Sequence, residues 1–357
     1  MISVELVDIA KTYGSVVAIS NVSLTFNQGK FYSLLGPSGC GKTTILRIIA
    51  GFITPDSGDV YIMGKRVNNL PPYKRNVGMI FQSYALWPHM TIYENIAFGL
   101  EIHHIKDKAE LKKRVMEVLE VVHLSGFEQR YPNELSGGQQ QRVAMARIIA
   151  IKPATILFDE PLSNLDRKLR MEMQVELKLL QNKLGITAIY VTHDQEEALS
   201  LSDQIMVMSV GKIEQIGAPM DIYDNPRNKY VANFIGTVNF FEGKVISIIS
   251  NSLIKVRIDN NMYLLVPYEL NHIEEGSDVI TYVRPEKSEI FIEKPILEEN
   301  VFTGIVKYIT YQGSSARYGI QLSNGREIII DKTLAIKQYG QNEKVYLKLY
   351  PKFLCKK

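Results

Sequence analysis

The sequence has few cysteines and no long apolar run. Its 357 residues include two cysteines, Cys40 and Cys355, far apart in the chain. We therefore expect no structural disulfide, and we expect the protein to work in a reducing compartment. No apolar run approaches the roughly 20 residues that cross a bilayer, so we expect no membrane-spanning helix. The first residues also lack a basic segment followed by an apolar one, so we expect no signal peptide.

An excess of one charge is missing as well. The chain has 41 Lys and Arg residues against 38 Asp and Glu residues, a formal net charge of +3. Without a long basic run, this balance gives no case for a nucleic-acid-binding protein. Hydrophobic residues make up 46% and charged residues 22%, which is typical of a soluble globular protein. The length allows two or three domains.

The strongest motif is a glycine-rich stretch between a strand-like and a helix-like apolar run. It reads Gly36-Pro37-Ser38-Gly39-Cys40-Gly41-Lys42-Thr43-Thr44. Strand, glycine-rich loop and helix in this order predict a phosphate-binding loop. The glycines let successive backbone N–H groups point at one anion, and the helix adds its positive end. Lys42 would reach the β- and γ-phosphates, and the Thr43 hydroxyl would ligate Mg²⁺.

Polar residues follow three apolar strand-like runs further along the chain. Asp159 and Glu160 end the run 155–158, and carboxylates are costly to bury without a function. We expect Asp159 to hold Mg²⁺ with Thr43, and Glu160 to polarise the attacking water. Gln82 and His193 follow runs of the same kind. Because the carboxyl ends of parallel strands share one rim, Gln82 is predicted to reach the metal or a water, and His193 the γ-phosphate or a water.

A second anion-binding helix end is predicted at Ser136-Gly137-Gly138-Gln139. Ser136 is well placed to cap the helix that follows. A cap alone does not require two glycines, because they weaken the first turn of a helix. They favour a close approach of backbone N–H groups to a ligand.

The remaining pattern predicts an α/β part, residues 1–235, followed by an all-β part, residues 236–357. Short alternating runs before the loop predict an antiparallel flap. Tyr13 in this flap could stack on a base or be an ordinary strand aromatic. Helical spacing over about 88–150 predicts a helical insertion.

After residue 235, short β-rich runs recur, and Asn324-Gly325 predicts a hairpin turn. We expect one or two small barrels of the oligonucleotide-binding-fold (OB-fold) kind. Such a fold does not by itself establish nucleic-acid binding.

Taken together, the motifs of the first ~235 residues resemble the ATPase subunit of an ATP-binding-cassette (ABC) transporter. The resembling segments are the Walker A loop (Gly36 to Thr44), the Q-loop (Gln82), the signature motif (Leu135 to Gln139), Walker B (Ile156 to Glu160), the D-loop (Ser163 to Asp166) and the switch histidine (His193). The resemblance implies that Tyr13 stacks on adenine and that Asp166 belongs to the nucleotide site.

The resemblance also implies partners. Two copies would form a head-to-tail homodimer, each ATP lying between the loop of one chain and the signature motif of the other. The dimer would work with two transmembrane permease subunits and, indirectly, an extracytoplasmic solute-binding protein. The chain would be peripheral on the cytoplasmic side of the cell membrane. The helical insertion and residues 82–90 would form the groove for a permease helix.

The later part of the chain resembles the maltose-type sugar importers with a transport-associated OB-fold (TOBE) domain. The strings that carry this are 194–198, 215–217, 221–226, 234–236, 239–243 and 284–286. Polyamine, ferric-iron and phosphonate importers share most of them; a sugar is preferred. More distant alternatives are a non-transport ABC ATPase and a nucleic-acid-binding OB-fold protein. The latter needs exposed aromatics interleaved with cations, for which the run 307–318 is the candidate.

Overall fold

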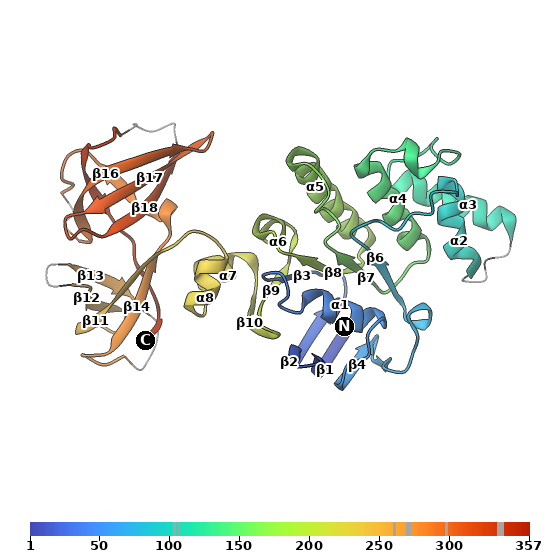
Figure 1. Cartoon of the computed structure of the whole chain (residues 1–357), viewed down its shortest axis with the longest axis horizontal. Coiled ribbons are helices and arrows are strands. Elements are labelled where there is room, and N and C mark those ends of the chain that lie inside the picture. The colour runs from blue at the N-terminus through green and yellow to red at the C-terminus, as the bar shows by residue number, and fades with distance from the viewer. Residues whose placement is uncertain (103–104, 106, 260–261, 269–272, 297–298, 334–338) are drawn as a thin grey trace. The chain divides into compact units, whose positions relative to one another are not determined.

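The computed structural model describes residues 1–102, 105, 107–259, 262–268, 273–296, 299–333 and 339–357. The chain divides into two compact units, residues 1–222 and 223–357. The sequence pattern places the boundary between the α/β part and the all-β part a little later, at about residue 235. The two units are shown in Figure 1 and are described separately below.

The first unit is built on a six-stranded sheet with the strand order β10-β9-β3-β8-β7-β6. All neighbouring strands are parallel except β9 and β10. Strands β3, β7 and β8 are buried along their whole length, as expected for a parallel sheet covered on both faces. The strands are β3 (Phe31–Leu35), β6 (Val77–Ile80), β7 (Thr155–Asp159), β8 (Thr187–Thr192), β9 (Gln204–Ser209) and β10 (Lys212–Gly217).

A second, antiparallel sheet confirms the predicted flap. Its order is β2-β1-β4-β5, and its apolar side chains share one core with helix α1 (Lys42–Ala50) and the main sheet. That core includes Leu24 and Phe26 from the flap, Ile45 from α1 and Leu34 from β3. The strands are β1 (Ile2–Tyr13), β2 (Val16–Asn27), β4 (Ser57–Ile62) and β5 (Lys65–Arg66).

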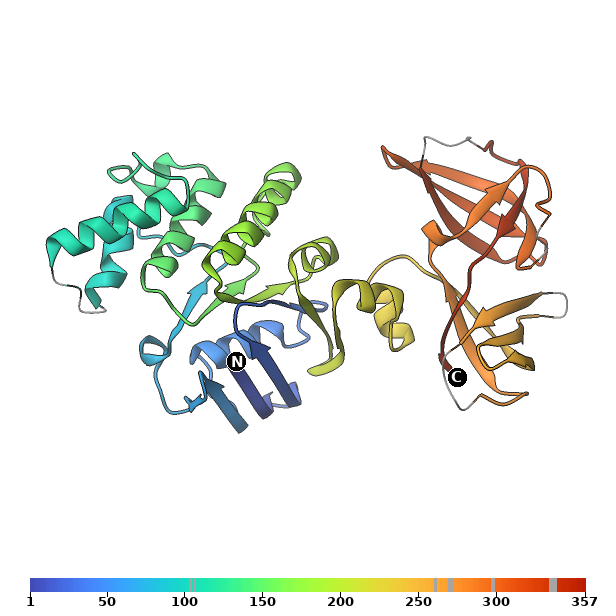
Figure 2. The same cartoon turned by 180° about the vertical axis from the view of Figure 1, so that it is seen from behind.

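Helices α2 to α4 lie between β6 and β7 in the chain and pack together as the α2–α4 body, which shares its core with the main sheet and α5. Figures 1 and 2 show them gathered at the β6 edge of the sheet. Their apolar faces meet in one core, to which Ile96, Val115 and Val143 contribute one from each helix. The helices of the first unit are α2 (Ile92–Ile102), α3 (Lys108–Val121), α4 (Gly137–Ala150), α5 (Arg167–Leu184) and α6 (Gln195–Leu201), with 3₁₀ turns at Pro72–Lys74 and Pro132–Glu134.

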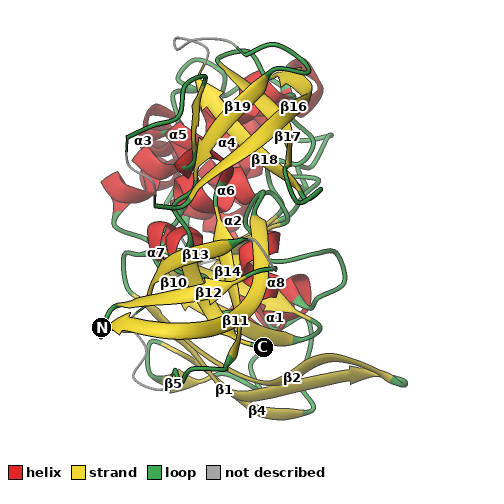
Figure 3. Ribbon diagram, turned by 90° about the vertical axis from the view of Figure 1, so that its left-hand side faces the viewer, coloured by secondary structure: helices red, strands yellow, loops and turns green. Residues whose placement is uncertain are grey.

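The second unit is all-β apart from short helices, as predicted. Its two five-stranded antiparallel sheets have the orders β13-β12-β11-β14-β20 and β15-β19-β16-β17-β18 (Figure 3). Both contribute to one core, which contains Phe241 and Val256 from the first sheet and Ile320 from the second. The strands are β11 (Asn239–Ser250), β12 (Leu253–Arg257), β13 (Tyr263–Pro267), β14 (Asp278–Val283), β15 (Glu289–Phe291), β16 (Val301–Tyr311), β17 (Ser315–Leu322), β18 (Glu327–Thr333), β19 (Lys344–Lys348) and β20 (Lys352–Lys356), with a 3₁₀ turn at Pro285–Lys287.

The hairpin predicted at Asn324-Gly325 joins β17 to β18. Gly325 has a φ of +83° and its N–H donates to the Leu322 carbonyl at 2.9 Å. The left-handed conformation explains why glycine occupies this position.

Two short helices, α7 (Pro219–Asp224) and α8 (Lys229–Phe234), precede the β strands. The side chain of Arg284, 3% exposed, fastens this segment to the second unit. Its guanidinium donates to the carbonyls of Tyr223 at 2.9 Å and Ala232 at 3.0 Å, and lies 4.2 Å from the centre of the Tyr223 ring. The segment from Tyr223 onward therefore belongs structurally to the β unit.

Candidate functional site

The glycine-rich loop lies between β3 and α1, as its sequence predicts. Gly39 and Gly41 have φ angles of +81° and +106°, in the region that side chains disfavour. Space is also limiting, because a Cβ on Gly36 would lie 2.6 Å from the Met208 carbonyl oxygen and one on Gly41 would lie 2.5 Å from that of Ala18. The loop is thus built for glycine by both conformation and crowding.

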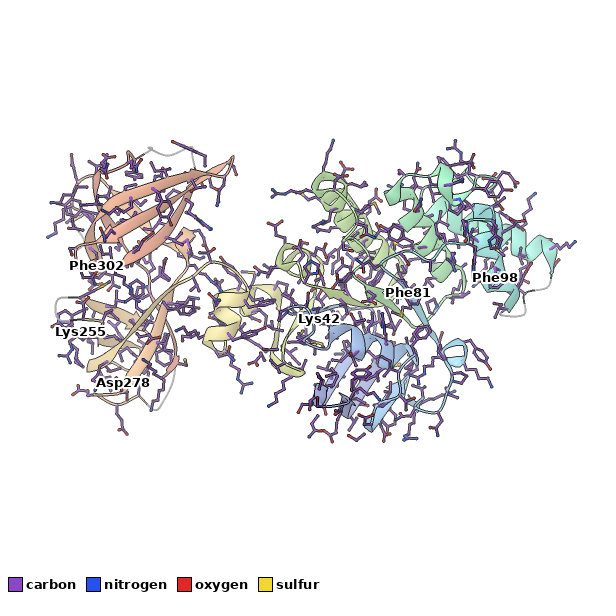
Figure 4. All side chains as sticks on the ribbon, viewed as in Figure 1. Lys42, Phe81, Phe98, Lys255, Asp278 and Phe302 are labelled. Carbon is purple, nitrogen blue, oxygen red and sulfur yellow. The ribbon has the colours of Figure 1, made fainter. Side chains whose placement is uncertain are left out.

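Lys42 closes the loop from inside. The residue is 4% exposed, and its Nζ donates to the Gly36 carbonyl at 2.7 Å and the Pro37 carbonyl at 3.0 Å. Figure 4 labels this side chain. Pro37, Ser38 and Gly39 are exposed, so the outer part of the loop is open to a ligand while the ammonium group is held beneath it.

Cys40 and Thr44 complete the loop. The Cys40 side chain is buried, and burial raises the pKa of its thiol against the lowering effect of Lys42. Cys40 is thus a neutral, inward-facing group, and Thr44 is partly buried in the first turn of α1.

The strand register brings the predicted polar residues to one rim. Leu35 is aligned with Thr192, and Val191 with Asp159. The residues that follow these strands, Gly36, His193 and Glu160, therefore leave the sheet at the same edge, as expected for parallel strands.

Thr43 and Asp159 meet at this rim. The Thr43 hydroxyl donates to Asp159 Oδ1 at 3.1 Å, and an Arg47 nitrogen lies 3.9 Å from Asp159 Oδ2. Burial raises the pKa of the Asp159 carboxyl, against the lowering effects of the Thr43 hydrogen bond and Arg47. In the part of the chain that the structure describes, no three His, Cys, Asp or Glu side chains gather to hold a metal.

A hydroxyl and a single carboxylate suit Mg²⁺, which usually takes one or two carboxylates and completes its shell with water and substrate phosphates. Gln82 lies beyond β6, where its backbone carbonyl accepts a hydrogen bond from the Asn164 amide at 3.1 Å. Within the described residues, no hydrogen bond joins the Gln82 side chain to Thr43 or Asp159.

Glu160 and His193 are in direct contact. Glu160 Oε2 lies 3.2 Å from His193 Nδ1. Glu160 has a φ of +48°, uncommon for a residue with a side chain, and its N–H donates to the Val191 carbonyl at 3.2 Å. The end of the sheet thus holds the Glu160 backbone in a strained conformation, a feature often found at functional sites.

The second predicted helix end has two structural roles, of which the sequence predicts the cap by Ser136 but not the packing of the glycines. Ser136 caps α4: its Oγ accepts from the Gln139 N–H at 3.4 Å, and Gln139 Oε1 accepts from the Ser136 N–H at 3.0 Å. A Cβ on Gly137 would lie 3.2 Å from Leu165, and one on Gly138 the same distance from Leu169. The two glycines therefore also allow α4 to pack closely against α5 and the loop before it.

Two other predicted residues are exposed. Tyr13 ends β1 with 47% of its surface exposed, and Lys11 Nζ lies 5.6 Å from the centre of its ring. Asp166 is exposed and caps α5, its carboxylate accepting from the Leu169 N–H at 3.1 Å. Both side chains are therefore accessible.

In the β unit, part of the aromatic and basic run 307–318 is used internally. Tyr318 is 2% exposed, and Arg317 donates two hydrogen bonds of 2.8 Å to Asp331. The Tyr308 ring covers Gly319, because a Cβ there would lie 2.0 Å from a ring carbon. These contacts occupy Arg317 and Tyr318, which an interleaved nucleic-acid surface would need, whereas Tyr308 and Tyr311 remain 39% and 62% exposed.

The arrangement in the first unit defines a class. A glycine-rich loop joins a buried parallel strand to a helix, its lysine lies inside the loop, and an acidic pair follows another strand at the same rim. These are the features of a P-loop nucleoside-triphosphatase.

Comparison with known proteins identifies the family. The family model described as ABC transporter matches residues 19–163, and that of the TOBE domain matches residues 281–352. The spermidine/putrescine import ATP-binding protein PotA of Clostridioides difficile is 48% identical over 331 residues, covering 92% of this chain and 91% of that protein. The protein of that name from Nostoc sp. is 46% identical over 328 residues, covering 92% and 86%.

Solved structures agree with this. The ATP-binding cassette MJ0796, in a dimeric post-hydrolysis state bound to ADP and phosphate, is 36% identical with a TM-score of 0.54, covering 60% of this chain and 98% of that one. The chain belongs to the ABC transporter family, as an ATP-binding subunit with a C-terminal TOBE domain. It is an ATPase, and its hydrolysis of ATP drives transport. Among the residues that the structure describes, no helix is long and apolar enough to cross a membrane.

The comparisons do not support the narrower maltose-type resemblance. The relatives reported above are named for spermidine and putrescine import, which the sequence strings had placed second to a sugar. The strings at 194–198 and 221–226 are shared between these importers and therefore could not separate them.

Proposed function

We propose that this chain is the energy-coupling ATPase of a polyamine importer, with spermidine or putrescine as the transported class. The observation that supports this is the 48% identity to a spermidine/putrescine import protein over 92% of the chain. The similarity includes the β unit as well as the nucleotide-binding unit. A sugar is the second candidate, supported only by the shared sequence strings.

The loop Gly36–Thr44 would bind the phosphates of ATP. Its exposed N–H groups face the ligand, and Lys42, now bonded to the loop's own carbonyls at 2.7 and 3.0 Å, would turn to the β- and γ-phosphates. Thr43 and Asp159 would hold Mg²⁺, which when bound offsets the charge on the phosphates, and Gln82 would approach this metal. Tyr13 would stack on the base.

Glu160 would accept a proton from the attacking water, and His193 would contact the γ-phosphate. The 3.2 Å contact between Glu160 and His193 places the two groups at one point of the rim. A half-buried carboxylate beside an exposed imidazole can orient a water between protein and phosphate. Glu160 and His193 are therefore our candidates for the catalytic residues.

We infer that two copies assemble head to tail. Within the described residues, the hydrogen bonds of Ser136 reach only Gln139 and Gln140. The exposed N-terminus of α4 is therefore open to the γ-phosphate of an ATP bound to a second chain. Gly137, Gly138, Gln139 and Asp166 would line the same contact. The MJ0796 cassette is itself dimeric, which supports the arrangement.

The permease would bind a groove between the main sheet and the α2–α4 body. This groove has a cavity volume of about 250 Å³, no Asp or Glu along it, and a lining that includes Tyr73, Trp87, Phe98, Ile102, Arg147 and Ile151. The Arg147 guanidinium lies 4.0 Å from the Trp87 ring centre and donates to the Ala85 carbonyl at 2.6 Å. Burial lowers the pKa of Arg147 to about 10.

No carboxylate pairs with Arg147 in the described part of the chain. An apolar groove with an unpaired cation favours an apolar helix that carries an acidic residue. We propose that two permease subunits each contribute such a helix, which would place this chain on the cytoplasmic face of the membrane as a peripheral subunit. A solute-binding protein would act on the opposite side.

Uptake measurements test the solute. Cells that express the chain with the membrane and solute-binding proteins encoded beside it should accumulate radiolabelled spermidine, with unlabelled putrescine competing and maltose not. The Glu160→Gln variant, expressed to the same level, should abolish uptake and serves as the control for ATP-driven transport. Accumulation of maltose but not spermidine would overturn the polyamine assignment.

A further inference from the structure

The strand end that carries His193 is held by buried polar side chains outside the nucleotide loop. Glu197, 3% exposed, lies in the first turn of α6. Its Oε2 accepts hydrogen bonds from the hydroxyls of Tyr190 and Thr192, each at 2.7 Å. Burial raises the pKa of both Glu197 and Tyr190. One carboxylate is thus bonded to two side chains of β8 just before His193.

Arg170 of α5 joins this cluster from the other side. Its guanidinium has nitrogens 3.4 Å from Asp194 Oδ2 and 4.0 Å from Glu197 Oε1, and it donates to the Leu165 carbonyl at 2.9 Å. Asp194 in turn caps α6, accepting from the Glu197 N–H at 3.2 Å. Because the guanidinium is a rigid planar fork, its acceptors are fixed relative to one another.

These contacts form a closed chain of interactions that includes the proposed catalytic pair, Glu160 and His193. From Glu160, the Ser163 hydroxyl reaches back to the Glu160 carbonyl at 2.9 Å, and two residues further on Leu165 accepts from Arg170. Arg170 and Glu197 then hold Asp194 and Thr192, the two neighbours of His193. The interactions close through the 3.2 Å contact between His193 and Glu160.

We propose that Arg170 and Glu197 are positioning residues that set His193 against Glu160, and that they couple His193 to the Ser163–Asp166 loop through the Leu165 carbonyl. A second chain that engages this loop would therefore also move His193 into or out of place. The inference rests on the proposed roles of Glu160 and His193.

Single substitutions with matched controls test the positioning. Arg170→Lys keeps the charge but loses the fork, and Glu197→Gln keeps an acceptor for the hydroxyls while turning an amide N–H group towards Arg170. Each should lower kcat for ATP about 10–100-fold, the cost of a small misplacement, with the KM and the affinity for ATP unchanged. Arg167→Lys and Glu196→Gln, at exposed positions on the same two helices, should leave kcat unchanged.

A double-mutant cycle separates positioning from a general effect on the structure. If Arg170 acts through His193, Arg170→Lys should cause no further loss in the His193→Ala background, measured by single-turnover hydrolysis. An equal loss in both backgrounds would overturn the inference alone, as would an unchanged kcat of both Arg170→Lys and Glu197→Gln. A His193→Ala variant with normal kcat would overturn the proposed role of His193 and this inference with it. Urea unfolding of each variant, followed by Trp87 fluorescence, shows that the chain is folded, and a kcat loss seen only in unfolded variants also counts against the inference.

Discussion

Replacing Gly41 with alanine should destabilise the first unit through two separable effects. The φ of +106° puts a new Cβ in the left-handed region, which costs about 1–2 kcal/mol. The Cβ would also lie 2.5 Å from the Ala18 carbonyl oxygen and 2.6 Å from Ile19 Cδ1. A backbone oxygen in a sheet cannot move away cheaply, so overpacking adds about 1–3 kcal/mol. The sum, about 2–5 kcal/mol, is a large share of a typical domain stability of about 5–15 kcal/mol.

Gly14 provides the matched control. It has a φ of +59°, but no atom lies within 4 Å of the Cβ it would gain. Gly14→Ala should therefore show the conformational cost alone, about 1–2 kcal/mol. The difference between the two variants measures the crowding of the phosphate loop by β2.

The assay is urea unfolding monitored by tryptophan fluorescence. Trp87 is the single Trp of the chain and packs on Phe98, with the ring centres 4.5 Å apart, so its signal reports the first unit only. Gly41→Ala should have the lower unfolding midpoint at an unchanged slope. The two variants could instead have free energies of unfolding that agree within about 0.5 kcal/mol, which is an ordinary error for such a comparison. In that case β2 does not confine the phosphate loop.

Three further predictions concern hydrolysis and charge. Glu160→Gln should still bind ATP but hydrolyse it about 10²–10⁴-fold more slowly, so light scattering should detect an ATP-dependent dimer; a monomer with bound ATP would contradict the head-to-tail arrangement. Lys42→Ala should lose ATPase activity in a phosphate-release assay, since it removes the ammonium group that the loop carbonyls hold beneath the loop; retained turnover would mean that Lys42 does not bind the phosphates. Hydrogen bonds from Lys357 at 2.8 Å and Lys229 at 2.9 Å lower the pKa of Glu242 from 4.5 to about 2. Because this pKa is lowered, the pairing stabilises the second unit above pH 4.5 and is lost as the pH falls towards 2. The group is exposed, so the gain is below about 1 kcal/mol; calorimetry of Glu242→Gln against wild type should show a difference that fades over this pH range and in about 1 M salt, and a pH-independent difference would refute the assignment.

Much of the first unit could be predicted because its signals are local. Buried parallel strands are continuous apolar runs, so β7 and β8 stand out, and the residues that follow them must share a rim. Helices α7 and α8 were not predicted, because six residues are too few to show a helical stripe.

The features that could not be predicted depend on contacts between distant elements. Nothing near Arg170 in the sequence indicates that its acceptors are Leu165 and Asp194, since the approach of α5 to the end of β8 is a property of the folded unit. For Gly138, the sequence predicts only that backbone N–H groups approach a ligand. Its packing against Leu169 appears only in the structure. In the β unit, the sequence likewise does not indicate that Arg317 pairs with Asp331, because the two residues lie on neighbouring strands.

The anchoring by Arg284 has a practical consequence for dividing the protein. A β half that started at residue 236 would leave out Tyr223 and Ala232, whose carbonyls accept from this guanidinium at 2.9 and 3.0 Å. Each lost bond to a charged group costs about 1.5–3 kcal/mol, and a cation would be left facing an apolar interior. Preparations of the isolated TOBE half should therefore begin at or before Tyr223, so that they retain α8, the N-terminal helix that Arg284 anchors.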